Sequence, residues 1–127
     1  MEFLLIALFL LGRILMGGYF LMMGITHFTK LEMMSGYAAS KKVPMPKAAV
    51  TVAGVLLIIG GLGILTGLYI SLSLLALALF LVLVSFMMHP YWRETDPQAK
   101  MADRVNFMKN MALLGSVLIL LYMVFPL

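Results

Sequence analysis

The two histidines are the side chains best suited to chemistry in this sequence, and each stands at the end of a long apolar run. His27 closes the first run and His89 follows the third, so membrane-spanning helices would hold both at a similar depth. An imidazole donates or accepts a hydrogen bond and exchanges a proton near neutral pH. The two histidines therefore predict a site for a polar group at one boundary of a membrane.

The fourth apolar run begins with polar groups that are costly in lipid unless they face protein or water. Helical periodicity places Asp103, Asn106 and Asn110 on one face, with Lys109 beside them, and Trp92 lies in the preceding connection. Together with the histidines, these residues predict a pocket for the head group of an amphiphile such as a quinone. Histidine and lysine would hydrogen-bond or protonate its carbonyl oxygens while the tail stays in lipid. The alternative interpretation is a structural network that caps helix ends.

Arg13 is a separate anomaly, because it lies near the middle of the first apolar run with no acid within one turn. A central arginine costs about 2.5–3.5 kcal/mol on insertion scales. Helical spacing places it on one face with Gly17, Phe20, Gly24 and His27, which predicts an anion or oxygen-ligand site inside the bundle. Alternatively, it extends to the membrane surface or bonds the backbone carbonyls and serines of a neighbouring helix. Its distance from His27, roughly 21 Å along a helix, favours two separate sites.

The chain contains no cysteine, which excludes disulfide exchange, thiolate metal sites and thiol-based quinone reduction. Two histidines at one depth also suggest bis-histidine haem, but nothing else in the sequence supports it. The 13 methionines gather near one boundary without forming a Met–His ligand set, so flexible packing explains them better than copper handling. We therefore predict no metal site, and a quinone is the candidate cofactor.

Four apolar runs must position these groups, and each approaches or exceeds the roughly 20 residues that a helix needs to cross a bilayer. The runs lack the alternation of a transmembrane barrel, and 64% of the residues are hydrophobic. The first run has neither a basic n-region nor a small-residue cleavage site, so we expect a retained span rather than a signal peptide. We predict one all-α domain over residues 1–127, an integral membrane four-helix bundle with spans at residues 3–28, 48–65, 68–88 and 105–126.

The basic residues are confined to alternate connections, which predicts the topology. All but Arg13 of the nine basic residues lie in the first connection or around the third: Lys30, Lys41, Lys42, Lys47, Arg93, Lys100, Arg104 and Lys109. By the positive-inside rule, these two connections face the cytoplasm and both termini lie outside a plasma (inner) membrane. This placement explains the net charge of +4 without nucleic acid.

The connections differ in character. The first carries apolar residues at helical spacing opposite charged ones, which predicts an amphipathic helix at about residues 30–42 in the head-group plane, with Lys41 and Lys42 on its polar face. Pro46 then begins the second span, and Gly67 forms a tight turn between the second and third. The third connection, residues 89–103, mixes both charge signs with prolines and predicts a solvated loop.

Small residues predict how the helices pack, because helices in lipid associate through close contact rather than water exclusion. Residues seven apart mark one line on each of three helices: Gly17 and Gly24, Gly54 and Gly61, and Ser71, Ala78 and Ser85. Such lines predict a compact left-handed four-helix bundle.

These residues resemble the DoxX family over almost the whole chain. The matching segments are residues 12–17 (GRILMG), 24–28 (GITHF), 43–46 (VPMP), 89–92 (HPYW) and 107–115 (FMKNMALLG). The resemblance implies a four-helix membrane protein of bacterial or archaeal type, associated with quinone-linked sulfur oxidation or oxidative stress, often beside soluble redox partners. The positions that match the family motif are Arg13, His27, His89, Trp92, Lys109 and Asn110. The lack of cysteine argues against a direct thiol relay.

Three functions are consistent with these features, and whether the protein is an enzyme stays open. The first is a redox-associated subunit that handles a quinone or similar amphiphile at the cytoplasmic boundary, with a cytoplasmic redox protein as candidate partner. The second is a non-catalytic anchor or assembly protein for soluble partners. The third, a small transporter, would need a homo-oligomer, and no internal repeat supports it. Besides the lipid bilayer, a homo-oligomer is a candidate assembly.

Overall fold

The computed structural model describes residues 1–125, and it is helical throughout. Its elements are α1 (Glu2–Thr29), α2 (Leu31–Ser40), α3 (Pro46–Thr66), α4 (Ile70–Met88), the short 3-10 helix η1 (Tyr91–Arg93) and α5 (Pro97–Val124). Four helices are long and apolar enough to cross a membrane, and none of residues 1–125 belongs to a strand. The predicted all-α class with four membrane-spanning helices is confirmed. The end of the predicted fourth span, residue 126, lies outside the described residues.

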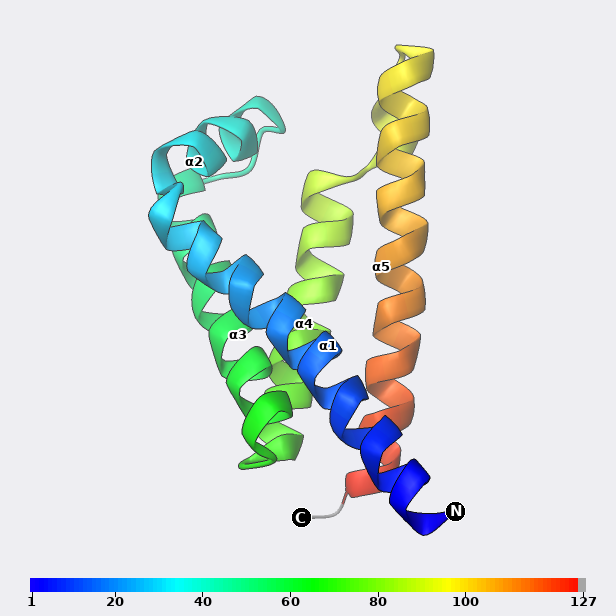
Figure 1. Cartoon of the computed structure of the whole chain (residues 1–127). Helices are drawn as coiled ribbons and strands as arrows, with labels where there is room; N and C mark the ends of the chain where they lie inside the picture. The colour runs from blue at the N-terminus through cyan, green and yellow to red at the C-terminus, as the bar shows by residue number, and fades with distance from the viewer. Residues whose placement is uncertain (126–127) are drawn as a thin grey trace.

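The helices pack in sequence across the molecule: α1 lies against α3, α3 against α4, and α4 against α5, while α2 covers one end of α3. Figure 1 shows that α1 begins and α5 ends at one end of the molecule, with α2 and the start of α5 at the other. The two histidine-bearing helix ends, Thr29 of α1 and Met88 of α4, therefore lie toward the α2 end.

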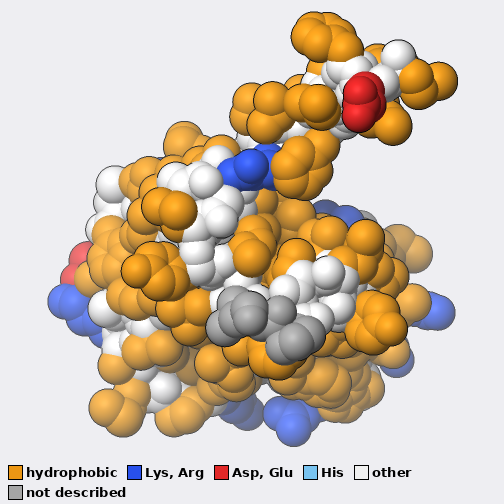
Figure 2. Space-filling view, turned by 90° about the horizontal axis from the view of Figure 1, so that it is seen from below, with side chains coloured by type: hydrophobic (Ala, Val, Ile, Leu, Met, Phe, Trp, Pro, Cys, Tyr) orange, Lys and Arg blue, Asp and Glu red, His pale blue; other side chains and the backbone are white. Residues whose placement is uncertain are grey.

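A small apolar core joins the four long helices. Phe20 of α1, Leu57 of α3, Leu77 of α4 and Val117 of α5 are among its buried members. Many large apolar side chains outside this core are exposed, and hydrophobic atoms cover most of the face shown in Figure 2. This distribution suits a protein whose solvent is lipid.

The first turns of α1 make the bundle more open than the compact one that we predicted from the sequence. Residues 1–12 are exposed on every face, and Figures 1 and 2 show this part of α1 projecting away from the other helices. The physical reason is that lipid tails solvate apolar side chains, so no water exclusion forces such a segment against its neighbours.

Glycines lie where α1 meets α3. A Cβ atom added to Gly24 would lie 3.1 Å from the carbonyl oxygen of Gly54, and one added to Gly17 would lie 3.0 Å from that of Gly61. The backbones of the two helices thus approach each other at the glycines that the sequence singled out. On α4, Ser71 and Ser85 are buried and Ala78 is half-buried.

The helix boundaries follow local signals. Pro46 occupies the first turn of α3, and Gly67, with a φ of 75°, ends α3 in the left-handed conformation that glycine favours. The predicted solvated loop at residues 89–103 is wrong, because α5 begins at Pro97. Asp96 caps this helix by accepting a hydrogen bond from the Ala99 N–H at 2.9 Å, and a proline directly after such a cap starts a helix rather than breaking one.

Candidate ligand-binding site

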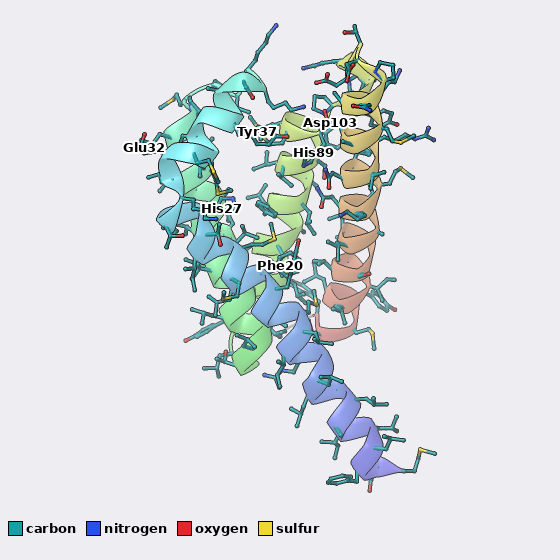
Figure 3. All side chains as sticks on the ribbon, turned by 45° about the horizontal axis from the view of Figure 1, so that its top comes forward. Phe20, His27, Glu32, Tyr37, His89 and Asp103 are labelled. Atoms are coloured by element: carbon teal, nitrogen blue, oxygen red, sulfur yellow. The ribbon has the colours of Figure 1, made fainter. Side chains whose placement is uncertain are left out.

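A half-open cavity of about 480 Å³ lies at the α2 end of the molecule, lined by parts of α1, α2, α3 and α4 and by the connection between α2 and α3. Its volume falls in the range usual for small-molecule sites. The lining side chains are apolar, several of them methionines, except for three: His27, Tyr37 and His89. Figure 3 shows these three residues in the part of the molecule where α1, α2 and α4 come together. The structure thus places both predicted histidines on one cavity.

His27 is fixed by its own helix. The ring is buried, with 7% of the residue exposed, and its Nδ1 lies 2.7 Å from the Met23 carbonyl oxygen one turn earlier. A carbonyl oxygen only accepts, so Nδ1 carries the hydrogen and donates it. The edge-on ring of Phe80 packs beside it, with centroids 6.2 Å apart, and Gly54 of α3 leaves room for its Cβ.

His89 is fixed from another helix. It follows the last residue of α4, and its Nδ1 lies 3.2 Å from Oδ1 of Asp103 in α5. The ionised carboxylate only accepts, so Nδ1 of His89 is again the donor. Within the described chain the Nε2 atoms of both histidines make no hydrogen bond, and neither is among the buried atoms that lack a partner. Both nitrogens therefore keep some exposed surface, and both histidines line the cavity.

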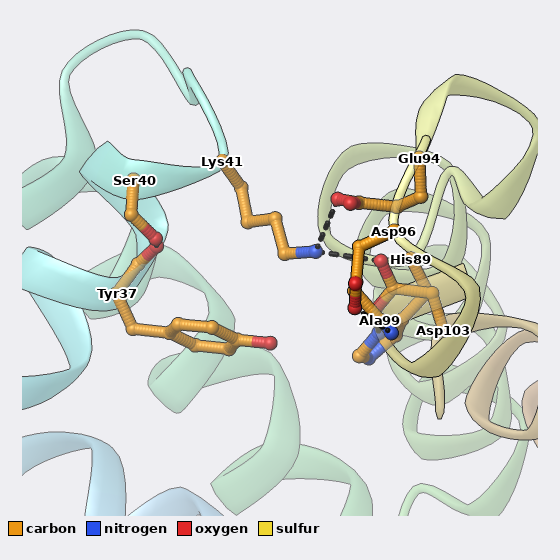
Figure 4. A network of polar contacts seen from close by, with 8 residues as sticks. All are labelled: Tyr37, Ser40, Lys41, His89, Glu94, Asp96, Ala99 and Asp103. Atoms are coloured by element: carbon orange, nitrogen blue, oxygen red, sulfur yellow. Dashed lines mark hydrogen bonds and ion pairs between the residues drawn. The ribbon is translucent and has the colours of Figure 1, made fainter. Parts of the chain in front are cut away.

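Asp103 is the centre of a polar network that joins α2 to α5 (Figure 4). Its Oδ2 accepts a hydrogen bond from Nζ of Lys41 at 2.6 Å, and Lys41 also reaches Oε1 of Glu94 at 3.2 Å. The Asp103 side chain is 5% exposed and that of Lys41 14%. Partial burial acts to lower the pKa of Lys41, but the hydrogen bonds to Asp103 and Glu94 outweigh it and raise the pKa above its usual value.

This network corrects the interpretation of Lys41 as a residue of a solvated helix face. Helix α2 ends at Ser40, and Lys41 is its C-cap, so the helical periodicity no longer sets the direction of its side chain. Helix α2 is also attached to the bundle, because its buried Ala38 packs with Val43 and with Val50 of α3. An acid such as Asp103 at the start of a membrane helix is a signal for a nearby cation that the sequence prediction did not use, and the sequence does not select one of several lysines.

Arg13 lies at the opposite end of α3 from the cavity and does not line it. Its Nε donates to the Ile64 carbonyl oxygen at 2.9 Å, and Nη2 donates to that of Leu65 at 3.0 Å. The guanidinium also lies 5.5 Å from the centre of the Phe9 ring. Arg13 thus binds the C-terminal carbonyls of α3, where helix dipoles favour a cation. This is the carbonyl-bonded arrangement that stood as the alternative to a ligand site.

The remaining candidate residues are not brought to the cavity. Trp92 stacks edge-on with Tyr91 and Phe107, with ring centroids 5.3 and 5.5 Å apart, in an aromatic cluster that joins η1 to α5. On α5, Asn106 and Asn110 are half-buried and Lys109 is exposed. Helix α5 packs on α4 and η1 rather than on α1 or α3, which keeps these side chains away from His27.

Metal coordination finds no support in the described part of the chain. No group of three or more histidine and acidic side chains within residues 1–125 is arranged to hold a metal ion. The site instead offers one imidazole nitrogen from each of two histidines that line an apolar cavity. In one of them, His89, the other ring nitrogen donates a hydrogen bond to a carboxylate.

These features define a helical membrane protein with a histidine-bearing cavity at one end of its bundle. The family model described as DoxX matches residues 8–90, which is more than half of the chain, and the protein belongs to the DoxX family. The match includes His27, Lys41 and His89 but ends before Asp103. No curated protein and no solved structure matches the chain.

Proposed function

We propose that this protein is a redox-associated membrane subunit that binds the head group of a quinone or a similar amphiphile in the cavity between α1, α2, α3 and α4. The observation that carries the proposal is the pair of accessible Nε2 atoms, on His27 and His89, in an otherwise apolar cavity. Apolar walls with few convergent polar groups are typical of small-molecule sites.

The surroundings of the cavity suit a ligand with an apolar tail. A second hollow, of about 510 Å³, follows the side of α1 between Ile14 and Thr26. It shares Met23, His27 and Met34 with the cavity, so these three side chains separate the two spaces. Methionine side chains are flexible and adapt to a neighbouring molecule. A ring in the cavity and a tail along α1 would use both.

His89 suits proton exchange with such a head group. A proton taken up at Nε2 would give an imidazolium whose Nδ1–H still donates its hydrogen bond to Asp103. Glu94, which is paired with Lys41 and is 29% exposed in its side chain, connects the network to the water outside. The site therefore combines an apolar ring environment with a polar connection to solvent.

The proposal extends to location. The basic connections, α2 and the segment from η1 into α5, lie at the cavity end of the molecule, and the positive-inside rule places that end in the cytoplasm of a plasma (inner) membrane. A soluble redox protein would then reach the cavity from the cytoplasm. Trp92 and Lys109, both exposed near this end, are candidate contacts for such a partner.

Equilibrium binding of a decyl-substituted hydroquinone, the reduced form of the head group, to the protein in mild detergent tests the proposal. We expect binding that weakens by roughly tenfold in His27→Ala and in His89→Ala, since each removes one hydrogen-bonding group. The matched control is Lys109→Ala, a polar residue of the same family motif outside the cavity, which should bind like the wild type. Wild-type protein that does not bind this ligand, or histidine variants that bind it unchanged, would reject the proposal.

A second candidate function is a membrane anchor that assembles soluble partners. It is favoured by the start of α5, which extends past the end of α4 in Figure 1 and carries the exposed basic residues Lys100 and Arg104. An anchor of this kind predicts that exchange of residues 93–104 for a neutral sequence abolishes association with the partner. The His27→Ala and His89→Ala variants would still associate.

A further inference from the structure

We infer that the cavity selects the hydroxyl form of its ligand, a hydroquinone or phenol, over the carbonyl form. This inference rests on the proposed function, because it assigns the ligand state that the same cavity prefers. It depends on which nitrogen of each histidine carries the hydrogen.

The hydrogen-bond partners fix that nitrogen in both rings. Nδ1 of His27 faces the Met23 carbonyl oxygen at 2.7 Å, and Nδ1 of His89 faces the Asp103 carboxylate at 3.2 Å. Both partners are acceptors, so each Nδ1 must donate. A neutral imidazole has a single N–H group, and this use of it leaves Nε2 with a lone pair. The cavity thus offers two hydrogen-bond acceptors from two different helices.

Hydrogen-bond donors are scarce among the lining side chains. Apart from the histidines, the one lining side chain in residues 1–125 with a polar hydrogen is Tyr37, whose hydroxyl can serve a single oxygen atom. A quinone carbonyl oxygen placed against Nε2 would bring a lone pair of oxygen against the lone pair of nitrogen, with no hydrogen atom between them. A hydroxyl group in the same place donates its hydrogen to Nε2. The lining therefore complements the reduced or phenolic ring.

Lys41 maintains this arrangement without lining the cavity. It donates to Asp103 Oδ2 at 2.6 Å, which keeps the carboxylate ionised and its other oxygen free to accept from His89. The charged groups joined to His89 are thus Asp103, Lys41 and Glu94, and Tyr37 is the further titratable residue on the cavity wall. Lys41 and Asp103 are positioning residues, which set the tautomer of His89.

The size of the preference follows from one hydrogen bond gained or lost. A bond that the hydroquinone makes and the quinone lacks is expected to separate their dissociation constants by roughly tenfold. A methyl ether of the hydroquinone keeps the ring and both oxygen atoms but has no hydrogen to donate. It should therefore bind as weakly as the quinone.

The test measures binding of three ligands with one scaffold to the purified full-length protein: decyl-1,4-hydroquinone, its dimethyl ether and the corresponding quinone. Anaerobic buffer at pH 8 prevents oxidation and keeps an ordinary imidazole neutral. We expect the hydroquinone to bind roughly tenfold more tightly than the other two. The difference should shrink in His27→Phe and His89→Phe, which keep a ring of similar shape, and persist in Lys109→Ala.

The outcomes separate this inference from the proposed function. Equal binding of all three ligands would overturn the preference for hydroxyl groups while retaining the cavity as a quinone site. If none of the three ligands binds, both this inference and the proposed function are overturned. A preference for the hydroquinone that survives in both phenylalanine variants would show that the histidines do not cause it, and would also overturn the inference.

A second measurement does not depend on a variant that folds. Nitrogen NMR of protein labelled with ¹⁵N only in histidine reports two imidazole rings, because the sequence has two histidines. We expect both rings at pH 8 to carry hydrogen on Nδ1 and none on Nε2. A ring with its hydrogen on Nε2 would offer the ligand a donor instead and would overturn the inference at that histidine.

Discussion

Nζ of Lys41 and Oδ2 of Asp103 lie 2.6 Å apart although 62 positions separate them in the sequence. Their contact ties the end of α2 to α5, two helices that otherwise pack on different neighbours. The same carboxylate accepts a hydrogen bond from the ring of His89, so this ion pair connects α2, which lines the cavity, with one of the two histidines of the cavity. It is both a structural link and a determinant of the site.

Removal of the ammonium should destabilise the protein measurably. In Lys41→Met, the carboxylate of Asp103 keeps its place in a largely buried setting without its closest cation, and such a loss costs up to about 3 kcal/mol. We expect a lower midpoint of thermal unfolding in detergent. The matched control is Lys47→Met, which breaks an ion pair with Glu32 of 3.0 Å whose side chains are 65% and 85% exposed. That change should cost less than about 1 kcal/mol, and equal effects would contradict the assigned role of Lys41.

The ion pair also predicts how stability depends on pH. Because the folded-state pKa of Lys41 is raised, its contribution is complete below the pKa of a lysine in the unfolded chain and is lost as pH rises through the folded-state pKa. The difference in thermal midpoint between the wild type and Lys41→Met should therefore stay constant from pH 7 to pH 9. It should shrink only at more alkaline pH, above the ordinary lysine value of about 10.4. A difference that already disappears at pH 8 would contradict this sign.

The sequence predicted some residues of the site and missed the contacts of others, and the difference between the two groups has a physical cause. Periodicity along a single helix places Gly17, Phe20, Gly24 and His27 on one face, and these are the buried residues of α1. The pairing of His89 with Asp103 depends instead on how α5 packs beside α4, which periodicity does not contain. Lys41 was misplaced because it lies just past the end of α2, where a turn rather than a helix directs the side chain.

The fold was predicted more fully than the site because hydrophobic run length alone identifies membrane helices. The boundaries were less accurate at α5. Its polar first turns, from Pro97, lack the apolar signal used for a span, and the cap at Asp96 followed by a proline marks where the helix begins. The Asn106, Lys109 and Asn110 group was assigned to the pocket from its depth and its shared helix face. Neither property specifies toward which neighbouring helix that face of α5 is turned.

The close contact of α1 with α3 predicts different tolerance for two glycines on the same helix. A Cβ atom at Gly24 would lie 3.0 Å from the Ile58 backbone nitrogen, so Gly24→Ala must separate the helices slightly and is expected to cost about 1–3 kcal/mol. Gly18 has no atom within 4 Å of its added Cβ, and Gly18→Ala should be neutral or stabilise by up to about 1 kcal/mol. Thermal unfolding of the two variants in the same detergent makes the comparison. Equal midpoints would show that α1 is not held against α3 at Gly24.

Arg13 and the histidine cavity should respond independently to mutation, because they lie at opposite ends of α3. Arg13→Met removes two hydrogen bonds, to the carbonyl oxygens of Ile64 and Leu65, and leaves the last turn of α3 without these donors. We expect a loss of roughly 1–3 kcal/mol in stability together with unchanged affinity for the decyl hydroquinone. Arg13→Lys should restore only part of the stability, since an ammonium lacks the planar fork of donors that spans two carbonyls. A large loss of ligand affinity in a folded Arg13→Met protein would show instead that the two ends of the bundle form one functional unit.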